Sequence, residues 1–186
     1  MPKKSKPAAA KTAEPSQGRA RKKRPIFAEG HKRKFLVVVD ETPECESALA
    51  FAASRALRTA GQLALLYVIE PDVDFQWLAV EDVAREEGHN KAKAVFRLFG
   101  RKLKAMGFEA LEPEEIVREG MKSDEITKLI EEDEDIGVLV LGASKDPSGP
   151  GPLVTYLAGG RLAGTFPIPI TVVPGHLSIE EILALA

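Results

Sequence analysis

Short apolar runs, separated by segments of helical pattern, constrain the fold of this chain more than any other feature. Four runs have the length of a β-strand and a fifth is weaker. The four are Phe35–Val39, Leu63–Ile69, Gly137–Leu141 and Ile168–Val173, and the weaker one surrounds Glu115–Arg118. Continuous hydrophobicity of this kind is typical of strands covered on both faces. The sequence therefore predicts an α/β fold with a five-stranded parallel sheet, helices on both faces and right-handed crossovers.

The segments between the runs carry helix signals. Apolar residues at helical spacing predict helices over about residues 43–60, 83–106, 123–130 and 153–163. Thr42 is expected to cap the first helix, with Pro43 at its first position, and Ser123 is expected to cap the third. Pro169 lacks a backbone donor, which favours an edge position for the last strand.

Composition limits the class of protein. The chain has 186 residues, of which 44% are hydrophobic and 29% charged, enough for one ordinary core. No apolar run approaches the roughly 20 residues that a membrane span needs, and no apolar signal-peptide core follows Met1. The single Cys45 excludes an intrachain disulfide, and a structural role is favoured over a reactive one. We therefore expect a soluble, cytoplasmic protein.

The charge is distributed unevenly along the chain. Residues 1–34 hold 12 Lys and Arg against 2 Glu, a net charge of +10, so the remainder carries −12. This segment is poor in large apolar residues and is expected to be a disordered basic tail. The run Arg19–Arg24 suits an anionic partner such as nucleic acid or a membrane surface, although contact with the acidic body is the favoured interpretation. We divide the chain into this tail, an α/β domain at 35–175 and a C-terminal helical extension at 176–186.

The loop that follows Leu141 is a candidate anion site. It begins at Gly142, is rich in Gly, Pro and Ser, and leads into a helical pattern near Pro152. Glycines allow backbone N–H groups to approach a ligand, and a helix start presents partial positive charge. Many strand-to-helix turns share this composition and bind nothing, so the loop alone does not establish a ligand. Ligands of parallel sheets bind outside the carboxyl ends of the strands, and Asp40 ends the first strand on this same edge.

Other polar groups indicate a functional site less strongly than this loop does. The acidic run Glu131–Asp135 is interpreted as a solvated connection, because consecutive carboxylates repel and point in different directions. His89 has no neighbouring histidine or cysteine, which disfavours a metal site. No combination of residues typical of nucleophilic or acid/base catalysis is present, so we do not expect an enzyme.

Several motifs, in their order and spacing, resemble the universal stress protein family over about residues 33–175. They are the first strand with Asp40-x-Thr42, the Leu-Leu-Tyr-Val-Ile run, Val117-Arg-Glu-Gly120, Val-Leu-Val-Leu-Gly142 and Pro-Ile-Pro-Ile-Thr-Val-Val. The family fold is a five-stranded parallel sheet of the kind expected above. The resemblance implies a stress-response regulator, in many members one that binds ATP, together with Mg²⁺ that accompanies the nucleotide. It implies at most slow ATP hydrolysis.

The resemblance also implies a set of nucleotide contacts. The expected residues are Asp40, Thr42, Val68, Gly142, Ser144, Lys145, Gly149, Gly151 and Thr155. Asp40, Val68 and Gly142 fit the family pattern, whereas Lys145 stands where a second loop glycine is usual. Two interpretations therefore stay open, a regulator that binds an adenine nucleotide and a nucleotide-free dimeric interaction module with a diverged loop. Many members of the family form homodimers through the fifth strand, which places the interface at Ile168–Val173.

Overall fold

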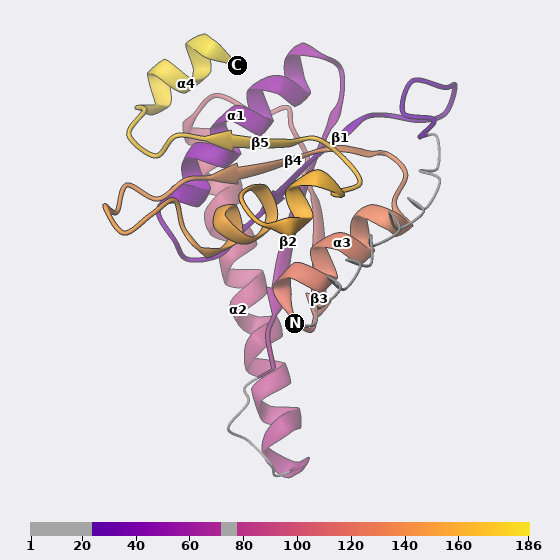
Figure 1. The fold of residues 1–186 in the computed structure, drawn as a ribbon, viewed down its shortest axis with the longest axis vertical. Coiled ribbons are helices and arrows are strands. Elements are labelled where there is room, and N and C mark those ends of the chain that lie inside the picture. Colours follow the sequence, from indigo (N-terminus) through magenta and orange to yellow (C-terminus); the bar gives the residue numbers. More distant parts are fainter. Residues whose placement is uncertain (1–23, 72–77) are drawn as a thin grey trace, which may run out of the picture.

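A five-stranded, all-parallel sheet forms the centre of the molecule (Figure 1). The computed structural model describes residues 24–71 and 78–186, so the prediction made for residues 1–23 lies outside the described residues. The strands are β1 (Lys34–Val38), β2 (Gln62–Ile69), β3 (Glu114–Glu119), β4 (Ile136–Gly142) and β5 (Ile170–Val173). Their order in the sheet is β3-β2-β1-β4-β5. The predicted fold class is confirmed.

Four helices and two short helical turns cover the sheet. They are α1 (Glu44–Arg58), α2 (Leu78–Ala105), α3 (Lys122–Glu132), the π-type turn η1 (Val154–Ala158), the 3-10 turn η2 (Arg161–Gly164) and α4 (Ile179–Leu185). Helices α1, α2 and α4 cover one face, and α3, η1 and η2 cover the other, on the viewer's side in Figure 1. No helix in the described part of the chain is long and apolar enough to cross a membrane.

Alternate residues of each strand supply the two halves of the core. In β1, Phe35 and Val37 contact the α1 side, whereas Leu36 and Val38 contact the α3 side. All four are at most 5% exposed. A strand buried on both faces must be apolar throughout, which explains why the runs are continuous rather than alternating.

Both predicted helix caps differ from the structure. Pro43 holds the cap position of α1, and the Thr42 hydroxyl donates to Asp40 instead of accepting from the helix. Met121 holds the cap position of α3, and Ser123 lies within its first turn. The cap position lies one residue after Thr42 in α1 and two residues before Ser123 in α3, and neither cap residue accepts a hydrogen bond from the first turn with its side chain.

The predicted helix over 153–163 is interrupted. Gly159 and Gly160 separate η1 from η2. Glycine is a poor helix former, and a Cβ at Gly160 would lie 2.8 Å from the Tyr156 carbonyl oxygen.

The last strand is also shorter than its apolar run and begins at Ile170. Pro169 still accepts a hydrogen bond from the Leu139 N–H but has no donor to extend the ladder.

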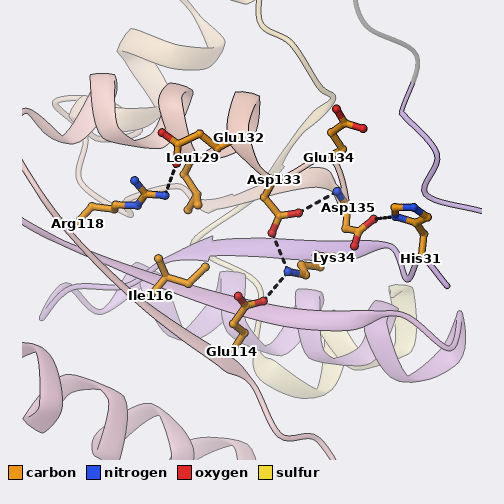
Figure 2. A pocket seen from close by; sticks show the side chains of 10 residues that line it. All are labelled: His31, Lys34, Glu114, Ile116, Arg118, Leu129, Glu132, Asp133, Glu134 and Asp135. Atoms are coloured by element: carbon orange, nitrogen blue, oxygen red, sulfur yellow. Dashed lines mark hydrogen bonds and ion pairs between the residues drawn. The ribbon is translucent and has the colours of Figure 1, made fainter.

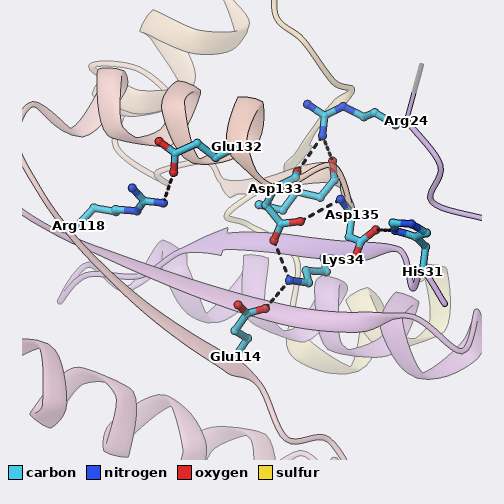
Figure 3. A network of polar contacts seen from close by, with 9 residues as sticks. Arg24, His31, Lys34, Glu114, Arg118, Glu132, Asp133 and Asp135 are labelled. Atoms are coloured by element: carbon cyan, nitrogen blue, oxygen red, sulfur yellow. Dashed lines mark hydrogen bonds and ion pairs between the residues drawn. The ribbon is translucent and has the colours of Figure 1, made fainter. Parts of the chain in front are cut away.

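Charged residues form ion pairs and hydrogen bonds that link the amino ends of the strands (Figure 3). Lys34 contacts Glu114 and Asp133, each at 2.7 Å, and His31 contacts Asp135 at 2.6 Å. Arg24 donates to three carbonyl oxygens between the end of α3 and the start of β4, those of Ile130, Asp133 and Ile136. Residues 24–34, which the sequence analysis places in the tail, therefore contact the body at several points, and Lys34 is already part of β1.

Candidate functional site

A small crevice opens at the carboxyl edge of the sheet, beside the ends of β1 and β4. Its volume is about 80 Å³. The walls come from the first turn of α1, the start of α3 and the loop after β4, and the polar side chains among them are Asp40, Thr42, Glu44, Cys45 and Lys122. The crevice is thus lined by two carboxylates, one ammonium group, one hydroxyl and one thiol. It lies at the edge where parallel α/β sheets bind ligands.

Asp40 is the most tightly oriented polar group of the crevice. Its Oδ1 accepts from the Thr42 N–H at 2.9 Å, from the Thr42 hydroxyl at 2.5 Å and from the Cys45 thiol at 3.1 Å. Burial opposes the charged form of Asp40, but the hydrogen bonds from Thr42 and Cys45 and the charge of Lys122 outweigh it and lower the pKa of Asp40. An ionised, immobile carboxylate therefore faces the crevice, with Oδ2 directed at Lys122.

Cys45 supports Asp40 through its thiol. Burial and the neighbouring Asp40 charge raise the pKa of the Cys45 thiol to about 12, so the thiolate is scarce at neutral pH. The thiol instead serves as a hydrogen-bond donor to the carboxylate. The structural role predicted for this cysteine agrees with that geometry.

Lys122 was missed by the sequence analysis. Its Nζ lies 3.5 Å from Asp40 and 3.7 Å from Glu70, and its backbone N–H donates to Glu70. The residue therefore bridges the ends of β1 and β2 from the start of α3. A signal was available, because Lys122 follows Gly120 at the end of a predicted strand and so reaches the same edge as Asp40.

Gly142 has a packing role that the sequence analysis did not anticipate. A Cβ at this position would lie 2.0 Å from the carbonyl oxygen of Glu44. The end of β4 and the first turn of α1 can therefore approach each other only because residue 142 has no side chain. Its neighbour in the crevice, Gly151, adopts φ 97°, a left-handed conformation that also favours glycine.

The structure brings together only part of the predicted contact set. Asp40, Thr42, Gly142 and Gly151 line the crevice. Five predicted residues do not line it, namely Val68, Ser144, Lys145, Gly149 and Thr155. Thr155 donates its hydroxyl to the Gly151 carbonyl, and the Ser144 hydroxyl accepts from the Asp146 N–H.

A larger pocket at the opposite edge is built from the charged network described above, and Figure 2 shows the side chains that line it. Its volume is about 550 Å³. Lys34 bridges Glu114 and Asp133, and Arg118 pairs with Glu132 at 2.6 Å. Burial opposes the charge of Lys34, but its hydrogen bonds to Asp133 and Glu114 raise its pKa. These ion pairs link β1, β3 and the end of α3, so we interpret the pocket as a structural contact between these elements. Within the described residues, no group of three or more potential ligands could hold a metal ion.

The fold and the crevice define a class of protein before any relative is considered. A parallel sheet with helices on both faces and an opening at its carboxyl edge is an open α/β domain of the doubly wound type. Residues 32–174 match the universal stress protein family, and the chain belongs to that family. A search of curated proteins gives no match.

Solved structures show the same fold at low identity. The universal stress protein UspA from Lactobacillus plantarum aligns with a TM-score of 0.60 and 19% identity, covering 76% of this chain and 97% of that one. A universal stress protein in complex with cAMP aligns with a TM-score of 0.54 and 20% identity, covering 76% and 97%. The universal stress protein from Archaeoglobus fulgidus in complex with dAMP aligns with a TM-score of 0.50 and 17% identity, again covering 76% and 97%.

Proposed function

We propose that this protein is a stress-response regulator that binds an adenine nucleotide in the carboxyl-edge crevice, with ATP as the first candidate. The observation that carries the proposal is the orientation of Asp40, a charged carboxylate fixed by three hydrogen bonds beside the crevice. A fixed acceptor of this kind suits the hydroxyl or amino groups of a nucleoside. Family membership supports the proposal, as do the relatives whose structures contain cAMP and dAMP.

The charges of the crevice favour a nucleotide that is bound together with a divalent cation. Glu44 and Asp40 both line it, and only Lys122 among the described lining residues is positive. Phosphate oxygens placed beside two carboxylates would be repelled. Mg²⁺ binds phosphate and carboxylate oxygens together, so we propose that Mg²⁺ accompanies the nucleotide. Glu44 is the carboxylate that would help to hold it, because Asp40 is directed at Lys122 and is assigned above to the nucleoside.

The size of the crevice requires a movement on binding. Ligand sites usually measure roughly 300–1,000 Å³, whereas this crevice measures about 80 Å³. The segment from Gly151 to Val154 forms one wall and is the part that must move outward, because the opposite wall is the rigid end of β1. We therefore expect nucleotide binding to change the conformation of this segment, which suits a regulator better than an enzyme.

Titration calorimetry with ATP, AMP and adenosine, each with and without Mg²⁺, tests the proposal. Asp40→Asn removes the charge while keeping the shape, and we expect it to weaken binding by at least about tenfold, the effect of losing one charged hydrogen bond. Glu86→Gln, an exposed change on α2, is the control and should bind as the wild type does. Equal affinity of Asp40→Asn and wild type would place the ligand elsewhere.

The alternative function is a nucleotide-free interaction module. It is favoured by the small volume of the crevice and by a loop whose Ser144, Asp146, Ser148 and Gly149 N–H groups already donate within the loop. Mass spectrometry of the small molecules released from freshly purified protein separates the two functions. Recovery of an adenine nucleotide in near-stoichiometric amount supports the nucleotide-binding regulator. If no nucleotide is recovered and titration calorimetry detects no heat of binding, the nucleotide-free interaction module is supported.

A further inference from the structure

The pocket at the amino edge is an open groove between the edge strand β3 and the end of α3. Its ion pairs lie along the walls and leave a volume of about 550 Å³ (Figure 2). Ile116 of β3 and Leu129 of α3 also line the groove, and both pack into the core on the α3 side. In the part of the sheet that the structure describes, β3 pairs with β2 alone. The groove therefore follows an unpaired edge of the described sheet.

The groove presents negative charge to the solvent. Five carboxylates line it, against the two cations Lys34 and Arg118. The cations are the shielded partners of their ion pairs, because the side chain of Lys34 is 14% exposed and that of Arg118 is 29% exposed. Their partners Glu114 and Glu132 are 47% and 57% exposed. A cationic segment can therefore pair with these outer carboxylates while the existing ion pairs remain in place.

The chain enters the described structure at the rim of this groove. Arg24, the first described residue, donates to the carbonyl oxygen of Asp133 (Figure 3), and Asp133 itself lines the groove. The residues that precede Arg24 are thus tethered beside the groove. A short link of this kind gives a tethered segment an effective concentration in about the millimolar range, so weak contacts are enough to hold it.

The residues before Arg24 carry the complementary charge. Residues 1–23 hold eight Lys and Arg against one Glu, a net charge of +7, and four of the eight stand at positions 19–23. Five residues in an extended chain span about 17 Å. The six-residue strand β3, which forms one wall of the groove, has a length of about 20 Å. Residues 19–23 therefore match the groove in both charge and length.

We propose that residues 19–23 bind in this groove, with their cationic side chains on the carboxylates of β3 and of the corner between α3 and β4. The sequence alone favours contact of the basic segment with the acidic body as a whole, and the groove gives that contact a definite place. The groove lies at the amino edge of the sheet. The proposal is therefore independent of nucleotide binding at the carboxyl edge.

Paramagnetic relaxation enhancement in the full chain tests the proposal. A nitroxide attached to Ser16→Cys reports which backbone amides the segment approaches, while the buried Cys45 stays unlabelled. We expect the strongest broadening at residues 114–118 and 132–135. The broadening should disappear at about 0.5 M NaCl, because salt screens exposed ion pairs. Broadening that is centred on another part of the surface, or that persists in high salt, would overturn the assignment.

Matched variants separate binding in the groove from mere tethering at Arg24. Glu114→Gln together with Glu132→Gln removes the two outer carboxylates and should reduce the broadening at residues 114–118 at least about twofold. Glu86→Gln together with Glu87→Gln removes the same charge from exposed positions of α2 outside the groove and should change nothing. Equal broadening in the two double variants would show that the groove does not hold the segment.

A variant of the segment itself tests the same contact without changing any described residue. Arg19→Gln together with Arg21→Gln should also reduce the broadening at residues 114–118 at least about twofold, and it stays informative if the groove variant fails to fold. A mixture of nitroxide-labelled protein and ¹⁵N-labelled protein without nitroxide identifies the source of the segment. We expect no broadening in the mixture. Broadening as strong as in the singly labelled sample would assign the groove to the segment of a second copy and would overturn the contact within one chain.

Discussion

At the carboxyl edge of the sheet, individual residues determine both the packing of the elements and the charge of the crevice. Asp40 is held by Thr42 and Cys45, and its second oxygen faces Lys122. Gly142 permits the close approach of β4 to α1 that places Glu44 at the crevice. The geometry of the candidate sites therefore rests on the absence of a side chain at residue 142 as much as on the polar groups themselves.

Gly142→Ala is predicted to destabilise the fold. The new methyl group would lie 2.0 Å from a backbone oxygen, which cannot move aside as a flexible side chain could. We expect the free energy of unfolding in urea to fall by about 3 kcal/mol. Gly100→Ala is the matched control, because a Cβ there meets nothing within 4 Å and the site is inside α2. That variant should gain up to about 1 kcal/mol; a Gly142→Ala protein as stable as wild type would contradict the packing role.

At the scale of elements, the end of α3 depends on a residue that is distant in sequence. Helix α3 has no basic residue in its last turn, and its final carbonyl groups carry partial negative charge. Arg24 supplies the missing cation and donates to the Ile130, Asp133 and Ile136 oxygens at 2.6–3.0 Å. The segment before β1 is thereby joined to the corner between α3 and β4 (Figure 3).

Arg24→Gln is predicted to loosen this corner. The variant loses the charged hydrogen bonds to the helix end, and because Arg24 is half-buried we expect a loss of only about 1–2 kcal/mol. Urea unfolding measures the loss, and hydrogen exchange should show faster opening of the last turn of α3. Arg101→Gln, an exposed change on α2, serves as the comparison. If both variants unfold at the same urea concentration, Arg24 contributes nothing to the corner.

At the scale of the whole molecule, β5 is the edge strand beside β4. Its four residues follow Pro169, so a partner strand can form a ladder only along Ile170–Val173. Ile170, Thr171 and Val172 are half-buried, while Val173 packs into the core on the α1 side. An apolar edge of this kind pairs with another strand unless something covers it. We propose that it pairs with its copy about a two-fold axis.

Val172→Lys is predicted to separate such a dimer. Lysine would place a charge in the shared contact of the two β5 strands. Sedimentation at micromolar concentration should show the wild type as a dimer and the variant as a monomer. Met121→Lys, which changes an exposed residue at the start of α3, should remain dimeric. A monomeric wild type under these conditions would exclude the proposed interface.

Local sequence determined the architecture of this protein. Each strand that is buried on both faces requires an unbroken apolar run, so the runs at Phe35–Val39 and Leu63–Ile69 already specify a covered parallel sheet. Pro169 likewise indicated an edge strand, because proline has no backbone N–H to donate to a neighbouring strand. Asp40 could be placed at the carboxyl edge because it directly follows a buried strand.

Tertiary structure alone decided which groups meet. Lys122 reaches Asp40 across 82 positions of sequence, and Arg24 reaches the end of α3 across more than 100. No local sequence pattern predicts such pairs, because the two partners come close to each other only when the chain folds. The same reason explains the helix caps, where Thr42 serves Asp40 instead of α1. It also explains why Lys145 does not line the crevice, since the path of the loop after Gly142 depends on its packing against Glu44 and Gly175.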